Sequence, residues 1–292
     1  MDAVITFVDG GDPLWQDDFR AARHGKAVAR RYRDWGTLPF LLRGIERHMP
    51  FIDRVFLVVA RESQVPSWAD RSRLQIVLHS DIIPSMYLPT FNSTTIEMFL
   101  HRIPGLSERF IYFNDDIFPV MDAVEEDFYP GGRPATGFSR HLLALNTFKR
   151  QTRRSDRLAR LALKQPSRPW FLRPQHTCSP MLKSDSEKVF DLVESKILCS
   201  LSPVRDANNP NQYLFLDYLY LSGQAVARRR SSRYLSLATA SPAKMEAAIT
   251  APRHQFLCIN DVDMKPERQA ALQEAMLRAF TTRFPEKSRY ER

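Results

Sequence analysis

The sequence predicts an α/β fold, in which an open sheet of mostly parallel strands is flanked by helices. Apolar runs of strand length alternate with segments of helical periodicity over roughly the first 120 residues. Several of these runs are continuously apolar, as expected for strands covered on both faces. The chain has 292 residues, 43% of them hydrophobic, so it can bury a substantial core.

The first predicted elements follow one another closely. The run AVITFVD at 3–9 is a short strand, and GGDP then turns the chain into a helix that starts near Pro13. A second helix at 37–48 places Leu38, Leu42 and Ile45 on one face. The next predicted elements are strands at 54–60 and 74–79, a helix at 96–103 and a strand at 110–113.

The pattern is less regular after Pro130. A basic helical region is followed by the proline-rich stretch QPSRPWFLRPQH, which predicts an extended segment because proline breaks helices. The remaining predicted elements are helices at 185–199, 211–223 and 266–280 and an apolar strand at 256–261.

The net charge of +9 is concentrated in one part of the chain. Between Arg140 and Arg173 there are ten basic residues and a single acid, Asp156. A helix would line up Arg153, Arg157, Arg160 and Lys164 as a stripe that attracts polyanions; a solvated helix face is the alternative. Nucleic acid is disfavoured because no helix-turn-helix, RNA-recognition or zinc-finger motif accompanies the charge.

Cysteine usage and hydropathy favour a cytoplasmic protein. Cys178, Cys199 and Cys258 are widely spaced and odd in number, so we expect ordinary reduced thiols. No apolar run approaches the roughly 18 residues that cross a bilayer, and MDAVITFVDG lacks the basic start and apolar middle of a signal peptide. A surface-bound state at the inner face of the membrane is a second expectation.

Three apolar runs end in aspartate: VITFVD at Asp9, FIYFNDD at Asp115 and Asp116, and FLCIND at Asp261. Because the carboxyl ends of parallel strands meet at one edge of a sheet, these carboxylates are expected to converge there. Hard oxygen ligands of this kind suit Mg²⁺ or Mn²⁺. The alternative is that each aspartate caps the helix or turn that follows its strand.

Long segments of the chain closely resemble the Stealth family of sugar-1-phosphate transferases. The first two conserved regions of that family are matched by VITFVDGGDPLW at 4–15, by 31–58 and by 66–116, which includes LPTFNSTTIE and FIYFNDD. The third and fourth are matched more weakly, by QHTCSPMLKSD with VRDANNPNQYLFLDYLY and by CINDVDM with RFPEKSRYE. The family includes bacterial capsule and exopolysaccharide enzymes and the catalytic subunit of the lysosomal-enzyme GlcNAc-1-phosphotransferase.

The resemblance implies transfer of a sugar 1-phosphate from a UDP-sugar to a hydroxyl of a bacterial polysaccharide or oligosaccharide acceptor, with release of UMP. It also implies a nucleotide-sugar-transferase (GT-A-like) architecture. Residues 1–130 would form the nucleotide-sugar-binding α/β half. Residues 131–292, helical and irregular and including the basic region at 140–173, would complete the same catalytic domain.

Site residues follow from the positions that match the family. The resemblance implies His176 as general base and Arg205 as the guanidinium that stabilises phosphate charge. Asp115 and Asp116 would bind the metal or orient the acceptor, and Asp261 would complete the acidic edge. The residues expected to bind nucleotide or sugar are Asp9, Gly10, Gly11, Asp12, Arg33, Asp34, Asn92, Ser93 and Glu97.

One departure from the family concerns the third region. An acidic pair usually follows the arginine there, whereas this chain has Asn208 and Asn209. Either Asp206 substitutes for the pair or the acceptor contact differs.

Two other functions are compatible with the residues alone. One is a glycosyltransferase with the same sheet and acidic pair, which attacks the anomeric carbon and releases UDP. The other is a non-catalytic module that binds anionic glycans through its basic stripe. The transferase is favoured because a binding module has no need for carboxylates at three strand ends beside a glycine turn.

Overall fold

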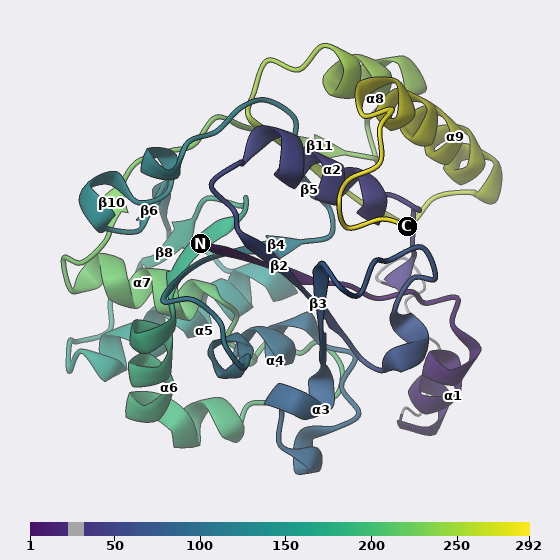
Figure 1. The fold of residues 1–292 in the computed structure, drawn as a ribbon. Coiled ribbons are helices and arrows are strands. Elements are labelled where there is room, and N and C mark those ends of the chain that lie inside the picture. The colour runs from purple at the N-terminus through teal and green to yellow at the C-terminus, as the bar shows by residue number, and fades with distance from the viewer. Residues whose placement is uncertain (23–31) are drawn as a thin grey trace. The chain divides into compact units, whose positions relative to one another are not determined.

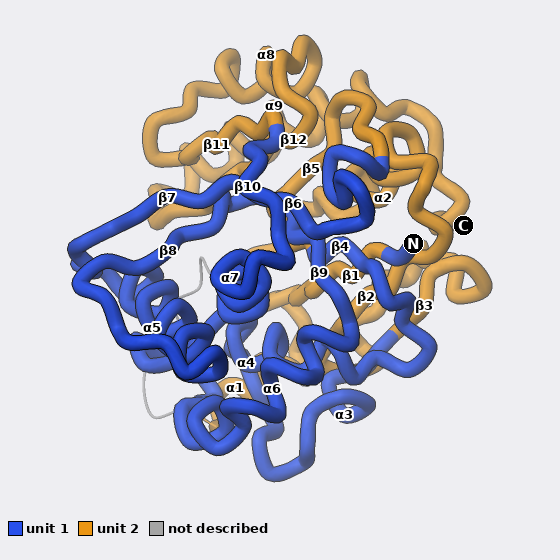
Figure 2. Tube along the Cα trace, turned by 90° about the vertical axis from the view of Figure 1, so that its left-hand side faces the viewer, with its two compact units in different colours: residues 1–2, 77–112, 125–230 blue, residues 3–76, 113–124, 231–292 orange. Residues whose placement is uncertain are grey.

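The computed structural model describes residues 1–22 and 32–292, and Figure 1 shows the course of the chain. The chain divides into two compact units, each built from several chain segments (Figure 2). Unit 1 comprises residues 1–2, 77–112 and 125–230, and unit 2 comprises residues 3–76, 113–124 and 231–292.

The predicted N-terminal strands lie mainly in unit 2. They are β1 (Asp2–Thr6), β2 (Arg54–Val59) and β3 (Leu74–Leu78), and they are hydrogen-bonded neighbours in the order β3-β2-β1. After its first residue β2 is buried throughout, which explains the continuous apolar run in its sequence.

A second sheet of unit 2 has the order β11-β12-β5. It is formed by β11 (Ser232–Ser236), β12 (Phe256–Asn260) and β5 (Ile117–Pro119). β11 runs parallel to β12, while β12 and β5 are antiparallel with Cys258 opposite Ile117. β12 therefore belongs to a different sheet from β1, so the expectation that all three aspartate-ending runs finish at one edge of one parallel sheet is wrong.

The helices of unit 2 pack through aromatic side chains. Phe280 stacks on Phe40 with ring centroids 5.4 Å apart and contacts Phe118 at 4.6 Å. Figure 1 shows α8 lying beside α9, and the two are in contact. The helices are α1 (Pro13–Ala22), α2 (Leu38–His48), α8 (Pro242–Thr250) and α9 (Pro266–Arg283), with a 3₁₀ turn at Glu62–Gln64.

Unit 1 contains shorter strand pairs. β4 (Arg109–Asn114), most of which lies in this unit, is antiparallel to β9 (Ser179–Leu182). β7 (Phe138–His141) is antiparallel to β8 (Phe171–Pro174), which occupies the proline-rich stretch predicted to be extended. A parallel pair joins β6 (Ala135–Thr136) to β10 (Val226–Ala227).

Helices α5 (Thr147–Ala162), α6 (Lys183–Leu198) and α7 (Tyr213–Leu221) contact one another in unit 1. Asn146 caps the start of α5, and its side chain accepts a hydrogen bond from the Lys149 amide. Arg160 does not extend a solvent-facing stripe, because it is buried and its guanidinium binds Asp156 at 2.9 Å. The shorter elements of unit 1 are α3 (His79–Ile82), α4 (Ser93–Glu97) and 3₁₀ turns at Ser85–Tyr87, Leu100–Arg102, Glu125–Asp127 and Pro130–Gly132.

The structure confirms the α/β class but changes two details. Strands pair both parallel and antiparallel, so the described sheets are mixed. The helix predicted at 96–103 is instead α4 followed by a 3₁₀ turn, because Asn92 caps the helix from Ser93 onward. Among residues 1–22 and 32–292, no helix has the length and apolar character needed to cross a membrane.

Candidate functional site

The acidic pair of unit 2 forms the connection between two strands. β4 ends at Asn114 and β5 begins at Ile117, so Asp115 and Asp116 make the turn that a glycine or proline would usually make. The Asp116 carbonyl accepts a hydrogen bond from the Ile259 amide of β12 at 2.9 Å. This bond fixes the acidic turn beside the end of β12.

The carboxylates of unit 2 are close enough to repel one another. Burial raises the pKa of Asp115 to about 8, and the charges of Asp116 and Asp34 add to that rise. Partial burial and the charge of Asp9 raise the pKa of Asp34, while a hydrogen bond from the Gly36 amide lowers it. Within unit 2 the expected residues Asp9, Asp34, Asp115 and Asp116 therefore act on one another electrostatically.

Asp261, after the last apolar run, is held by two residues from the start of the chain. The Arg33 guanidinium donates to both carboxylate oxygens, at 3.0 and 3.1 Å, and the Trp35 indole N–H donates at 3.1 Å. Burial raises the pKa of Asp261, although Trp35 and Arg33 oppose that rise. Arg33 therefore has a carboxylate partner within the protein.

The cluster has a composition suited to a hard divalent cation. Unit 2 places several carboxylates within electrostatic range. Burial first, and then the charges of Asp116 and Asp34, raise the pKa of Asp115, and a bound cation would favour its charged form. Carboxylate oxygens are the ligands that Mg²⁺ and Mn²⁺ prefer. The residues present therefore fit a divalent cation, which Asp115 and Asp116 would hold.

The glycines of the first loop serve the loop itself. The Gly10 amide donates to the Tyr32 carbonyl at 2.8 Å, and a Cβ on Gly10 would come within 2.2 Å of that oxygen. The Gly11 amide donates to Asp9 Oδ1 at 2.7 Å. Both amides are thus engaged within the protein, whereas the sequence led us to expect them to face a nucleotide; Gly10 is required for the close approach to Tyr32.

Asp12 also makes its hydrogen bonds within the protein. Its carboxylate accepts hydrogen bonds from Ser63 at 2.5 Å, Gln64 at 2.8 Å and the Leu14 amide at 3.0 Å. Burial alone would raise the pKa of Asp12, but these hydrogen bonds lower it. Asp12 therefore caps the start of α1 and ties it to the 3₁₀ turn.

A second group of predicted residues comes together in unit 1. Arg205 donates from Nη2 to the Ser93 hydroxyl at 2.6 Å, at the first residue of α4. At the last residue of α4, the Glu97 carboxylate accepts from the Gln212 amide at 2.9 Å and lies 3.5 Å from the Tyr112 hydroxyl. Burial raises the pKa of Glu97 to about 7, although Gln212, Arg205 and Tyr112 all lower it.

Asn92 is not available to a sugar in this structure. Its side chain is fully buried, and its Oδ1 accepts from the Thr94 amide at 3.2 Å and the Thr94 hydroxyl at 2.8 Å. Its Nδ2 donates to Asn209 at 2.9 Å and to the Ser202 carbonyl at 3.2 Å. Asn92 was expected to contact the sugar. In the structure it instead joins α4 to the loop that carries Arg205.

Asn209 explains the departure from the acidic pair. Its Oδ1 accepts from the Asp206 amide at 2.6 Å and from Asn92, while its Nδ2 donates to the Ser200 carbonyl at 2.6 Å. A carboxylate cannot donate, so an amide is required at this buried position. Asn208, in contrast, is exposed.

His176 also lies in unit 1. One ring nitrogen is 3.2 Å from the Tyr213 hydroxyl, and the imidazole contacts the Phe148 ring edge to face at 5.8 Å. Tyr213 is the first residue of α7 and follows Gln212, the partner of Glu97. Unit 1 thus gathers His176, Glu97 and Arg205 around the start of α7.

Comparison with known proteins identifies the family. The Stealth protein conserved region 2 matches residues 31–135, and conserved region 4 matches residues 247–292. The capsular polysaccharide phosphotransferase WcwK of Streptococcus pneumoniae is 30% identical over 336 aligned residues, which cover 100% of this chain and 99% of that protein. This chain belongs to the Stealth family.

Other phosphotransferases are similar over different lengths. The receptor polysaccharide phosphotransferase WefC of Streptococcus oralis is 30% identical over 100% of this chain and 99% of its own. A capsular polysaccharide phosphotransferase of Actinobacillus suis is 38% identical over 47% of this chain and 40% of its own. The chain is therefore an enzyme of the transferase class, as predicted.

Solved structures are more distant. Two structures of the galactosyltransferase LgtC were found, one with donor and acceptor sugar analogues and one of an active-site mutant. In each case the alignment covers 97% of this chain and 96% of the LgtC chain. Their TM-scores are 0.45 and 0.46, at 12% and 11% identity.

The matched Stealth regions contain part of the candidate site. The site residues within them are Arg33, Asp34, Asn92, Ser93, Glu97, Asp115, Asp116 and Asp261. Asp9, His176 and Arg205 lie outside both regions, and their roles rest on the shorter motifs around them.

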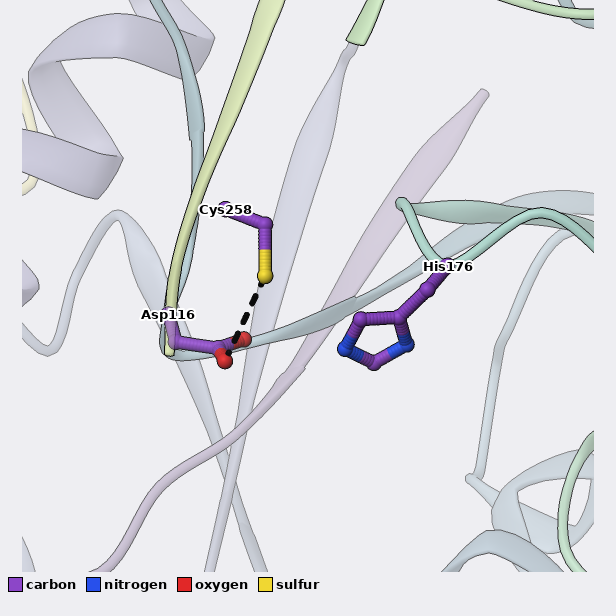
Figure 3. Close-up of side chains that lie close together, drawn as sticks. All are labelled: Asp116, His176 and Cys258. Carbon is purple, nitrogen blue, oxygen red and sulfur yellow. Dashed lines mark hydrogen bonds between the residues drawn. The ribbon is translucent and has the colours of Figure 1, made fainter. Parts of the chain in front are cut away.

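The structure adds neighbours of the candidate site residues that the sequence did not indicate. Figure 3 shows the Cys258 thiol directed at Asp116, with Sγ 3.6 Å from Oδ2; both belong to unit 2, whereas the labelled His176 belongs to unit 1. Burial and Asp116 raise the pKa of Cys258 well above its usual value. Gln64 donates to the Asp9 carbonyl at 2.9 Å and accepts from its amide at 2.8 Å. Neither partner lies near its residue in sequence, so no local pattern could have revealed the contact.

Proposed function

We propose that this protein transfers a sugar 1-phosphate from a UDP-sugar to a hydroxyl of a glycan acceptor in capsule or exopolysaccharide synthesis. The reaction releases UMP and leaves a phosphodiester. The observation that carries the proposal is the similarity, over all of this chain, to a protein named as a capsular polysaccharide phosphotransferase. The acidic cluster of unit 2 supports it, because such a cluster suits a metal-assisted reaction of a diphosphate.

The chemistry requires an in-line attack on the β-phosphorus. The acceptor oxygen forms a bond to that phosphorus as the bond to the UMP oxygen breaks, and the acceptor hydroxyl loses its proton. Negative charge is spread over the phosphate oxygens during the transfer. The protein must therefore supply a proton acceptor and positive groups in fixed positions.

His176 is proposed as the proton acceptor. Histidine is a common general base in enzymes, and the Tyr213 hydroxyl, 3.2 Å from a ring nitrogen of His176, orients the ring. Its assignment rests on the family's third region.

Arg205 is proposed to stabilise the charge on the phosphate. Its hydrogen bond to Ser93 and the adjacent buried Glu97 hold the guanidinium in one orientation. Ser93 is proposed to contact the sugar from the same position, while Glu97 acts by positioning Arg205.

In unit 2, Asp115 and Asp116 are proposed to hold Mg²⁺ or Mn²⁺, which when bound neutralises the diphosphate charge. Asp9, Asp34 and Arg33 are proposed to line the nucleotide site beside them. Asp261 positions Arg33 through the paired hydrogen bonds described above. We further propose, as expected from the sequence, that residues 1–130 bind the nucleotide sugar and that residues 131–292 complete the catalytic domain.

We also propose that the enzyme works in the cytoplasm, where UDP-sugars are made. A panel of UDP-sugars incubated with the protein, Mg²⁺ and glycan fragments tests the reaction, with UMP and UDP separated by chromatography. UMP formed only in the presence of acceptor supports the proposal. UDP as the sole nucleotide product would instead identify a glycosyltransferase.

A matched pair of variants connects the product to the site. His176→Ala is expected to abolish UMP formation. His254→Ala changes a histidine of unit 2 that has no place in the proposed mechanism and is expected to leave the rate near that of the parent protein. Equal rates in both variants would remove His176 from the mechanism.

A further inference from the structure

The segment between β7 and α5 exposes three leucines. Leu142, Leu143 and Leu145 are 63%, 64% and 75% exposed, although leucine is usually buried. We call residues 142–146 the leucine loop. Such a cluster of exposed large apolar side chains is typical of an interaction surface.

The backbone of the leucine loop is held in place while its side chains face outward. Arg153 donates to the Leu142 carbonyl, and Arg150 donates to the Ala144 carbonyl at 3.4 Å. Asn146 caps α5, and at the other end His141 pairs with Phe171 in the β7–β8 ladder. The exposure of the leucines is therefore a feature of a fastened loop within unit 1.

Positive charge predominates in the segment that carries these leucines. Between Arg140 and Arg173 the only acid, Asp156, is buried and paired with Arg160, so it does not offset the charge at the surface. The outer side chains of α5 and of the segment after it are exposed and basic. They include Arg150, Arg157, Lys164 and Arg168, with exposed Leu161 on the same face of α5.

We propose that the leucine loop and the basic face of α5 dock this enzyme on a membrane surface that contains anionic lipids. The leucines would enter the boundary between headgroups and acyl chains, and the basic side chains would contact lipid phosphates. An anionic glycan would be attracted by the same charge, but it offers no apolar layer for the leucines. The combination of both features favours the membrane.

Co-sedimentation with lipid vesicles tests this docking directly. The parent protein is expected to sediment with vesicles of phosphatidylglycerol and phosphatidylcholine in equal parts, and to remain in the supernatant with phosphatidylcholine alone. The triple variant Leu142→Ser, Leu143→Ser, Leu145→Ser is expected to bind the mixed vesicles about tenfold more weakly or worse. Arg157→Gln with Lys164→Gln should weaken binding to a similar extent and make it less sensitive to salt.

Leu192→Ser serves as the matched control, because Leu192 is 53% exposed on α6, outside the leucine loop. It should bind vesicles as the parent does. Unchanged thermal unfolding would show that the triple variant is folded. Vesicle binding needs no substrate, so its result is independent of the transferase reaction.

Three results would overturn the docking surface. One is equal vesicle binding by the parent and the triple variant. Another is a parent protein that ignores the mixed vesicles. The third is retention of the parent by a soluble phosphodiester glycan, unaffected by the leucine changes and without vesicle binding, which would assign the basic face to an anionic glycan.

Discussion

Nη1 of the Arg33 guanidinium donates to both carboxylate oxygens of Asp261 in an ion pair, although the two residues are 228 positions apart in the sequence. Their side chains are 17% and 18% exposed, so the pair is partly shielded from water. The Trp35 indole completes the contact. The last conserved region of the chain is thereby fastened to the segment that carries Asp34.

This pair is expected to stabilise unit 2. Arg33→Gln leaves a shielded carboxylate without its charged donor, which should lower the free energy of unfolding by about 1–3 kcal/mol. Arg33→Lys keeps the charge but changes the length and hydrogen-bonding geometry of the side chain, so its stability should fall between those of the parent and Arg33→Gln. Arg20→Gln is the control, since its pair with Asp17 is exposed, and should change stability by less than about 1 kcal/mol. Urea unfolding measures all three, and equal losses for Arg33→Gln and Arg20→Gln would refute the stabilising role.

The acidic turn is expected to be needed for turnover. Asp116→Asn should lower kcat at least about a hundredfold at saturating donor, because it removes a proposed metal ligand. Manganese binding followed by electron paramagnetic resonance should weaken in parallel. Asp17→Asn, at an exposed carboxylate of unit 2, should match the parent in both assays. A variant at Asp116 that bound manganese normally and turned over at the parent rate would exclude it from the metal site.

Glu97 should make stability depend on pH. Burial raises its pKa from 4.5 to about 7, so folding favours the neutral carboxyl. The resulting stabilisation is fully present below about pH 4.5 and is lost as pH rises through about 7, a change of about 3 kcal/mol. Glu97→Gln lacks this titration. The difference in unfolding free energy between parent and variant should therefore shift between pH 4.5 and pH 8, and a constant difference would contradict the buried carboxyl.

Two neighbouring asparagines offer a matched comparison. Asn209→Asp removes the donor to the Ser200 carbonyl and buries a charge, so it should cost about 2 kcal/mol or more. It should also lower turnover by loosening the loop that carries Arg205. Asn208→Asp, at an exposed position, should stay within about 0.5 kcal/mol of the parent. Thermal unfolding and initial rates compare the stability and the turnover of the two variants. Equal values for both variants would show that Asn209 does not hold the loop that carries Arg205.

Much of the fold could be predicted because apolar runs and helix starts are local features. β2 and α2 lie within one residue of the predicted bounds, and α1 begins at Pro13 as predicted. The helix predicted at 96–103 was wrong. The apolar spacing there reflects buried side chains, whereas the short helix α4 starts earlier, after its cap Asn92. The prediction also failed for Arg160, since a buried ion pair leaves no mark in a pattern of charges.

The candidate site was predictable in its residue types more than in its contacts. Carboxylates after apolar runs pointed to an acidic cluster, and unit 2 contains one. The partners of the site residues come from distant segments, as with Gln64 at Asp9 and Tyr213 at His176. Asn92 matched a substrate-facing motif but its buried amide serves the protein's own backbone. Long-range hydrogen bonds of this kind depend on the finished fold.

The most direct test of the proposed reaction follows the β-phosphorus of the donor. A UDP-sugar labelled with radioactive phosphorus at that position is incubated with the enzyme, a divalent cation and a glycan acceptor. Attack at the β-phosphorus predicts that the label enters the glycan and that the released UMP is unlabelled. Label recovered entirely in UDP, with an unlabelled glycan product, would contradict sugar-1-phosphate transfer.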